Sequence, residues 1–269
     1  MHDTTLDPND TGLDVVDLDE NPLFAARIPR DRDGALEIEG LRRLSRAFVE
    51  HPDTILQELV DAAISLCGAD SAGISMQQPD QPDEKFWVRV ATAGDYAHFL
   101  NATLPRTPSA CGVCLERNRP QRFLVNQNFF DLMGVTAPVV TDGILLPWQA
   151  DGARGTIWVM AHNRDEAFDR EDLRLMGVLA DFAAMAIRQQ RQQEALLEQA
   201  TAAAAGAMAN RLAHQINNPL QSLTNLVFLA SQGSHGEGSK QLADEIAPNL
   251  DRLSGLVRRL LALPFEPGD

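Results

Sequence analysis

The stretch GTIWVMAHNRDEAFDREDLRLMGVLADFAAMAI, residues 155–187, decides the fold. It opens with an apolar run of strand length, 156–160, and continues after an acidic segment into apolar residues at helical spacing. An earlier apolar run, 143–146, is joined to it through Ala150-Asp151-Gly152, whose Asp-Gly step predicts a β-hairpin. A strand hairpin that leads into a long helix predicts an antiparallel sheet covered by helices.

Outward from this stretch, the chain upstream changes from helical to strand periodicity. Apolar residues at helical spacing begin at Ala35 and resume, after a break at Asp53 and Thr54, as far as Leu66. Three further short strands are predicted at residues 73–76, 86–90 and 123–125. The order helix, two strands, irregular middle, three strands and helix predicts an α+β domain with one antiparallel sheet over residues 35–190.

Composition limits the partners of the chain. Its formal net charge of −15 argues against binding to nucleic acid or to an anionic membrane. No apolar run approaches the roughly 20 residues that span a bilayer, and the N-terminus lacks the features of a signal peptide. We therefore expect no membrane insertion and a cytoplasmic location. The Asp-rich residues 1–34 predict an acidic flexible tail.

Three segments resemble the GAF domain family. They are 155–159, then 168–173 with the helix that follows, and Ser109-Ala110-Cys111-Gly112 with Arg119-Pro120 ahead of a strand. The resemblance covers about residues 36 to 190. It implies a small-molecule sensor or a dimerisation module, in which an unidentified small-molecule ligand is the expected occupant and no particular cofactor is indicated.

Several side chains are candidates for lining a ligand pocket, although most could equally be core: Trp87, Arg89, Cys111, Cys114, Phe123 and Trp148. The pair Cys111 and Cys114 could bind metal or cycle as a redox pair. Because no further Cys or His stands at ligand spacing, ordinary pocket-lining cysteines are favoured and no metal site is expected. Cys111 also lacks the adjacent His of many bilin-attaching GAF sensors. The pattern of cyclic-nucleotide-binding relatives is only partly matched.

The chain from Glu171 to Ala230 consists almost entirely of helix-forming residues. Residues 191–208 are predicted to form a coiled-coil signalling helix, because so long a helix has no globular core of its own. Apolar residues then follow a heptad a/d pattern: Ala209, Leu212, Ile216, Pro219, Leu223, Leu226 and Ala230. In this register His214 lies at position f, which faces solvent, and Asn218 lies one turn further along the same flank.

A second amphipathic stretch follows the Gly/Ser-rich residues 231–239. Its apolar residues also recur at helical spacing: Leu242, Ile246, Leu250, Leu253, Leu256, Leu260 and Leu263. Two such helices joined by a loop predict an antiparallel all-α hairpin over residues 209–264, with a short tail at 265–269. A single hairpin cannot bury its apolar stripes, so we expect a homodimer that forms a four-helix bundle.

The run His214-Gln215-Ile216-Asn217-Asn218-Pro219-Leu220 resembles the H-box of histidine kinases, which lies in the HisKA-like dimerisation and phosphotransfer (DHp) hairpin. The resemblance implies that His214 accepts phosphate and that Asn218 positions water for dephosphorylation. Gln215 replaces the acidic residue that the family uses as a base, and an amide cannot take up that proton. The sequence contains no Gly-rich nucleotide lid and no Walker A motif either, so autophosphorylation from ATP is not expected.

Two hypotheses of different classes follow. In the first, a GAF sensor controls a dimeric phosphotransfer or phosphatase hairpin in a two-component system, whose partner is the receiver domain of a response regulator or a partner histidine kinase. In the second, the chain is a non-enzymatic dimerising scaffold that binds or sequesters a kinase or regulator. A fragment of a longer sensor histidine kinase is a further alternative.

Overall fold

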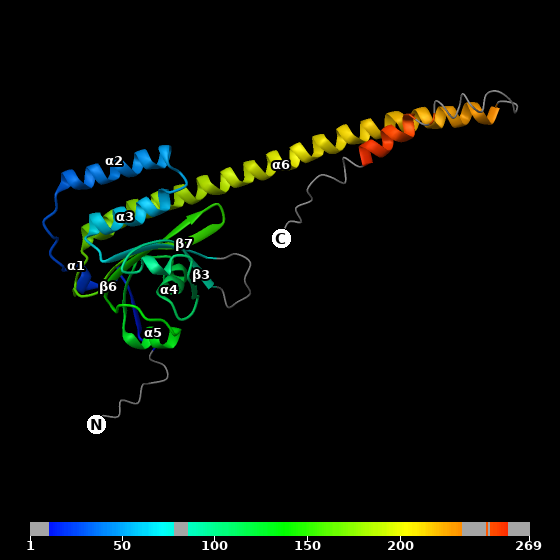
Figure 1. The fold of residues 1–269 in the computed structure, drawn as a ribbon. Helices are drawn as coiled ribbons and strands as arrows, with labels where there is room; N and C mark the ends of the chain where they lie inside the picture. The colour runs from blue at the N-terminus through cyan, green and yellow to red at the C-terminus, as the bar shows by residue number, and fades with distance from the viewer. Residues whose placement is uncertain (1–10, 78–85, 233–245, 247, 258–269) are drawn as a thin grey trace. The chain divides into compact units, whose positions relative to one another are not determined.

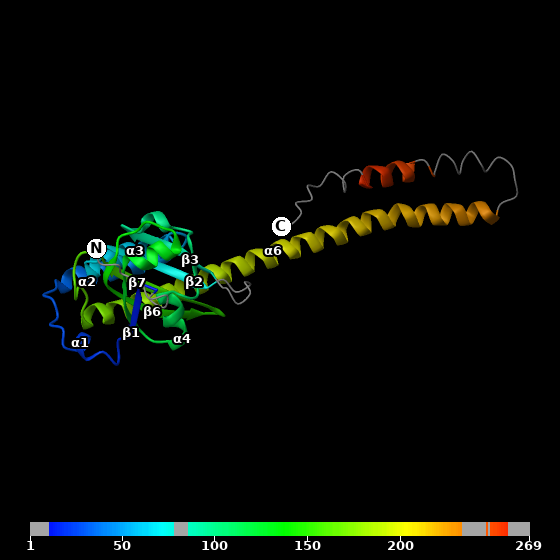
Figure 2. The same cartoon turned by 90° about the horizontal axis from the view of Figure 1, so that it is seen from below.

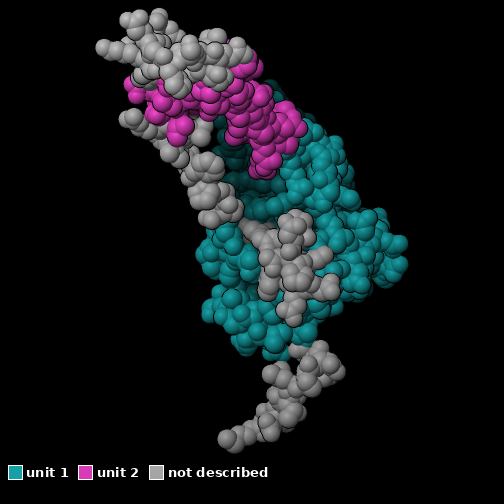
Figure 3. All heavy atoms as spheres, turned by 90° about the vertical axis from the view of Figure 1, so that its right-hand side faces the viewer, with its two compact units in different colours: residues 1–193 teal, residues 194–269 magenta. Residues whose placement is uncertain are grey.

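The computed structural model describes residues 11–77, 86–232, 246 and 248–257 (Figure 1). The chain divides into two compact units, Met1–Gln193 and Glu194–Asp269 (Figure 3). The first unit contains the sheet and the second is helical. Among the described residues, no helix is both long enough and apolar enough to cross a bilayer.

The first unit is built on one seven-stranded sheet with the strand order β1-β5-β6-β7-β2-β3-β4. Every neighbouring pair of strands is antiparallel, which confirms the predicted α+β architecture. The strands are β1 (Leu13–Asp17), β2 (Ser71–Gln77), β3 (Phe86–Gly94), β4 (Thr103–Pro105), β5 (Gln121–Val125), β6 (Val140–Ala150) and β7 (Ala153–Ala161).

The hairpin between β6 and β7 turns at the predicted Asp-Gly step. Ala150 pairs with Ala153 across the turn. Asp151 and Gly152 between them have φ angles of 44° and 80°. Two successive positive φ angles match the twist of a two-residue hairpin, and Asp and Gly tolerate this conformation best. The hairpin prediction is therefore confirmed.

Helices cover both faces of the sheet (Figures 1 and 2). On one face lie α3 (Ile55–Cys67) and the beginning of α6 (Arg170–Gln232), with α2 (Gly34–Glu50) packed against them; Phe48 of α2 contacts Phe182 of α6 edge to face. On the other face lie the short helices α4 (Ala110–Arg117) and α5 (Gln127–Met133). The sequence-based prediction left these two helices as an irregular middle.

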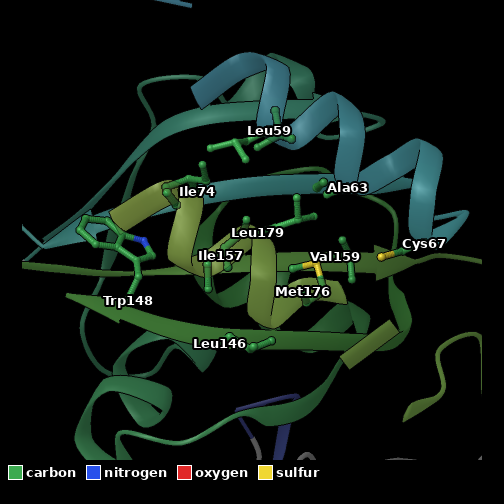
Figure 4. Close-up of a cluster of buried hydrophobic side chains, with 14 of the residues drawn as sticks. Leu59, Ala63, Cys67, Ile74, Leu146, Trp148, Ile157, Val159, Met176 and Leu179 are labelled. Carbon is green, nitrogen blue, oxygen red and sulfur yellow. The ribbon is translucent and has the colours of Figure 1, made fainter. Parts of the chain in front are cut away.

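Two hydrophobic cores lie on opposite faces of the sheet. The helix-layer core packs the sheet against α2, α3 and α6, and Figure 4 shows the part of it that lies against α3 and α6. Its members include Leu44, Leu59, Ala63, Ile74, Ile144, Leu146, Trp148, Ile157, Val159, Leu175, Met176 and Leu179. The cavity-side core packs it against α4 and α5, and its members include Tyr96, Cys111, Cys114, Phe123, Phe129, Phe130, Val140, Leu145, Trp158 and Met160. Since both faces are buried, the central strands read as continuous apolar runs.

The N-terminal segment differs from the flexible tail predicted for residues 1–34. Its described part, from residue 11, contains β1, which pairs with β5 along its whole length, and α1 (Pro22–Ala25), which is capped by the side chain of Asn21. Leu18 and Phe24 are buried in the helix-layer core. The acidic composition did not indicate that this segment is ordered, because its order depends on contacts with residues that are distant in the sequence.

Arginines fasten this segment to carboxylates of the sheet and of α6. Arg27 contacts Asp142 at 2.7 Å, and both side chains are almost fully buried. Arg30 and Arg32 each lie 2.7 Å from Asp172 in the first turn of α6. Such contacts between residues more than a hundred positions apart cannot be read from local composition.

Helix α6 begins at a reciprocal cap. The Asp169 carboxylate accepts hydrogen bonds from the backbone N–H groups of Glu171 and Asp172, and the Asp172 carboxylate accepts one from the N–H of Asp169. Burial opposes ionisation of Asp169. Hydrogen bonds from backbone N–H groups, including that of Arg30, and the charge of Arg32 outweigh this effect and lower the pKa of Asp169.

The second unit contains the remainder of α6 and a second helical stretch, residues 248–257. Within this unit the second stretch runs alongside α6 in the opposite direction (Figures 1 and 2). Pro219 of α6 and Leu256 of the second stretch are buried. The structure thus contains a long C-terminal helix and a helical partner segment; the predicted dimeric four-helix bundle stays a prediction.

Candidate functional sites: a small cavity and an exposed histidine

The first candidate site is a small cavity in the cavity-side core. Its volume is about 40 Å³, which is room for only a few water-sized atoms. Strands, short helices and the N-terminal strand all contribute to its wall, which consists of Leu13, Tyr96, Leu104, Ala110, Cys111, Phe123, Val125, Phe129, Phe130, Val140, Leu145, Trp158 and Met160. The site is therefore assembled from segments that span almost the whole first unit.

The polar atoms of this wall are already engaged in hydrogen bonds. The Tyr96 hydroxyl donates to the carbonyl of Pro138 at 2.8 Å. The indole N–H of Trp158 donates to Ser75 Oγ at 3.2 Å. The hydroxyl of Thr156 donates to Cys111 Sγ at 3.1 Å. These side chains therefore present mainly carbon surface to the cavity.

The structure places the predicted pocket residues in different surroundings. Cys111 and Phe123 line the cavity. Cys114 belongs to the cavity-side core but is not part of the wall, and its thiol lies 3.4 Å from the carbonyl of Arg119. Trp148 lies on the opposite face of the sheet, in the helix-layer core (Figure 4). The side chains of Trp87 and Arg89 lie outside the described residues.

Several wall residues were not predicted from the sequence. Leu13 was assigned to the flexible tail. Phe129 and Phe130 lie in α5, a helix of seven residues that is too short for its periodicity to stand out in the sequence. Met160 was recognised as strand but its face could not be assigned, because every residue of β7 from Gly155 to Ala161 is buried.

The cysteines are free thiols in this fold. Burial, followed by the nearby Cys111 and Asp17, raises the pKa of the Cys114 thiol well above its ordinary value. Burial likewise raises the pKa of Cys67. A thiol that stays protonated is a poor nucleophile and a poor metal ligand. Over the part of the chain that the structure describes, no three His, Cys, Asp or Glu side chains gather as a metal site would require.

His162 is buried and held on both ring nitrogens. Nε2 lies 2.8 Å from Ser71 Oγ and Nδ1 lies 2.8 Å from the carbonyl oxygen of Val139. Its ring stacks on Tyr96, with 5.0 Å between the centroids. With both nitrogens engaged, His162 acts as a structural bridge between β2, β7 and the segment before β6.

The second candidate site lies on α6 in the helical unit. His214, Gln215 and Asn218 are all exposed. The heptad positions Leu212, Ile216, Leu223 and Leu226 are partly buried, and Pro219 is buried. Ala209, assigned to the same stripe, is exposed, and the side chain of Ala230 lies outside the described residues. The stripe therefore extends from Leu212 to Leu226, with His214 and Asn218 off it.

The fold defines the class of protein to which this chain belongs. An antiparallel sheet with a helical layer on one face, a small cavity on the other and a long C-terminal helix is the architecture of an α+β sensor domain of signalling proteins. A family model described as GAF domain matches residues 49–188, just over half of the chain. The chain belongs to the GAF domain family.

Solved structures of GAF domains resemble this chain at low sequence identity. The GAF domain of a phosphoenolpyruvate-protein phosphotransferase from Coxiella burnetii is 16% identical, with 61% of this chain and 99% of that chain covered and a TM-score of 0.49. The phycoerythrobilin-bound GAF domain of a cyanobacterial phytochrome is 15% identical, with 60% and 100% covered and a TM-score of 0.45. No curated protein matches the chain.

Proposed function

We propose that this protein is a two-component signalling protein in which the GAF domain controls a dimeric phosphotransfer or phosphatase hairpin centred on His214. The observation that carries the proposal is the placement of His214 and Asn218. Both are exposed on consecutive turns of α6, next to a stripe that is buried or partly buried from Leu212 to Leu226. A partner protein can reach an imidazole in this position, because the packed side of the helix faces elsewhere.

Each residue of the site has a separate role. A ring nitrogen of His214 attacks the phosphoryl group of an aspartyl phosphate on the receiver domain, so that a P–N bond forms, the P–O bond breaks and the Asp carboxylate is released. Asn218, an amide one turn away, can orient a water molecule for hydrolysis of the same phosphoryl group. Gln215 cannot act as a base, so the phosphate on His214 is derived from a partner protein.

Exposed apolar side chains support a homodimer. In α6, Leu220 and Val227 are exposed and seven residues apart; in the second helical stretch, Leu250 and Val257 are exposed at the same spacing. Their repeat equals a heptad, which is the spacing of residues that face a neighbouring helix in a bundle. A second copy of the same helices offers complementary stripes of equal length, and burial of both would complete a four-helix bundle.

The proposal is tested with receiver domains charged with radiolabelled acetyl phosphate. We expect the full chain to accelerate loss of label from its cognate receiver or to acquire label itself. His214→Ala should abolish acquisition, and Asn218→Ala should slow release of inorganic phosphate. His51→Ala, which removes an exposed histidine of the first unit, is the matched control. Unchanged label in every mixture would count against the proposal.

A scaffold without chemistry is the second candidate function. Gln215 favours it, because the position lacks the acidic group that autophosphorylation requires. In this case a kinase or receiver binds the hairpin equally well after His214→Ala, and no phosphate moves. Binding measured by calorimetry beside the radiolabel assay separates the two functions.

A further inference from the structure

We infer that the cavity of the GAF domain takes a small, uncharged, apolar ligand rather than a bilin or a nucleotide. The inference rests on the sensor role proposed above and specifies its ligand class. Three features of the described cavity carry it: the absence of charge in its wall, the engagement of its polar atoms, and its size.

The described wall carries no formally charged side chain. Its thirteen residues are all apolar or aromatic, with sulfur in Cys111 and Met160. The Cys111 sulfur accepts a hydrogen bond from Thr156. The other polar groups are the Tyr96 hydroxyl and the Trp158 indole N–H, whose hydrogen bonds are described above. An anionic ligand would lose its hydration without gaining a cation in return, which is strongly unfavourable. The described wall therefore selects against phosphate and carboxylate groups.

Helix α4 does not offer an anion site in place of a charge. The first turn of the helix contributes Ala110 and Cys111 to the wall. However, the Ser109 hydroxyl oxygen accepts a hydrogen bond from the N–H of Gly112 at 3.0 Å and so caps the helix from within the chain. At Gly112 an added Cβ would lie 2.0 Å from the carbonyl oxygen of Arg106, so this loop is packed tightly on the helix. A ligand group would have to displace this cap in order to reach the N–H of Gly112.

The volume of the cavity also favours a small neutral ligand. A volume of about 40 Å³ holds only a few small heavy atoms, because one water-sized probe alone takes roughly 10–15 Å³. A linear tetrapyrrole or a cyclic nucleotide is many times larger and carries acidic groups. Small neutral molecules, of the size of dissolved gases or short hydrocarbons, match both the volume and the wall.

Xenon is a suitable probe for this cavity, because it is neutral and apolar and its size is close to that of the cavity. Crystals of the full chain under xenon pressure should show one site in the first unit, among Phe123, Leu145 and Trp158. Leu145→Phe should fill the space and remove the site. Leu146→Phe, one residue along β6 and facing the helix-layer core, is the matched control and should leave xenon in place.

Should Leu146→Phe fail to fold, Leu145→Ala keeps the test decisive, because it enlarges the same cavity and should raise xenon occupancy. A wild-type cavity that stays empty under xenon, or a site that persists in Leu145→Phe, overturns the inference.

The ligand class is then tested in solution by competition with xenon, followed by ¹²⁹Xe NMR on the full chain. Propane should displace xenon at a concentration at least roughly tenfold below that of butyrate, which adds only a carboxylate. Displacement by butyrate, cyclic AMP or biliverdin at lower concentrations than propane would overturn the inference. The same titrations on His214→Ala should give unchanged results. A negative result for ligand binding and a negative result in the phosphotransfer assay can therefore be distinguished.

Discussion

Arg27 and Asp142 form a buried ion pair that joins the N-terminal segment to the middle of the sheet. Nη1 of Arg27 lies 2.7 Å from Oδ2 of Asp142, and the side chains are 6% and 0% exposed. Arg122 contacts the other carboxylate oxygen at 2.7 Å, and the N–H of Phe168 donates to the same group. Asp142 thus connects β5, β6, the N-terminal segment and the start of α6.

Replacement of this carboxylate is expected to be costly. Asp142→Asn leaves the Arg27 guanidinium buried without a counter-charge and should lower the free energy of unfolding by about 3–5 kcal/mol. Urea denaturation followed by circular dichroism measures the change. Asp151→Asn breaks an exposed pair with Arg188 and should cost at most about 1 kcal/mol. Equal effects of the two substitutions would show that the buried pair is unimportant.

Ionisation of Asp169 makes the free energy of unfolding depend on pH. Its pKa is lowered in the folded protein, so its ionised form stabilises the fold at pH values above the unfolded pKa of about 3.9. This contribution is lost as the pH falls from that value through the lower folded pKa. In urea titrations at pH 7 and at pH 3, Asp169→Asn should destabilise the protein at pH 7 and differ less from wild type at pH 3. Asp131→Asn, at an exposed carboxylate of α5, should show no such convergence.

The N-terminal strand should be required for the first unit. Removal of residues 1–19 deletes β1 and the Leu13 side chain that closes part of the cavity. We expect a lower Tm and stronger binding of a dye specific for exposed apolar surface. Removal of residues 1–10 leaves β1 whole and is the control. Equal Tm values and equal dye binding for the two deletions would show that β1 does not contribute to the stability of the first unit.

Charge on the exposed stripe of α6 should prevent dimerisation. Val227 is 61% exposed, so Val227→Asp should leave the single chain folded while placing a carboxylate in the proposed helix interface. Light scattering coupled to gel filtration should report twice 29.5 kDa for wild type and 29.5 kDa for the variant. Ser222→Asp, also exposed on α6, should remain dimeric. A wild-type monomer would contradict the proposed bundle.

Strand and helix periods identified much of the fold correctly. The five strands expected from short apolar runs are all present, as β2, β3, β5, β6 and β7, although each is longer than predicted. The short strands β1 and β4 and the helices α4 and α5 were missed. Each of them is eight residues or fewer, too short for a periodicity to stand out.

The sequence by itself determined the α+β class, the turn at Asp151-Gly152 and the heptad stripe beside His214, because these depend on local spacing and turn chemistry. Only the tertiary structure decided which residues line the cavity. Leu145 and Leu146 are equally apolar neighbours on β6, yet one faces the cavity and the other the helix-layer core. When both faces of a sheet are buried, the polarity of a residue does not indicate which face its side chain lies on. The choice between pocket and core stayed open for Trp148 for this reason, and Leu13 was overlooked because its partners lie more than a hundred residues away.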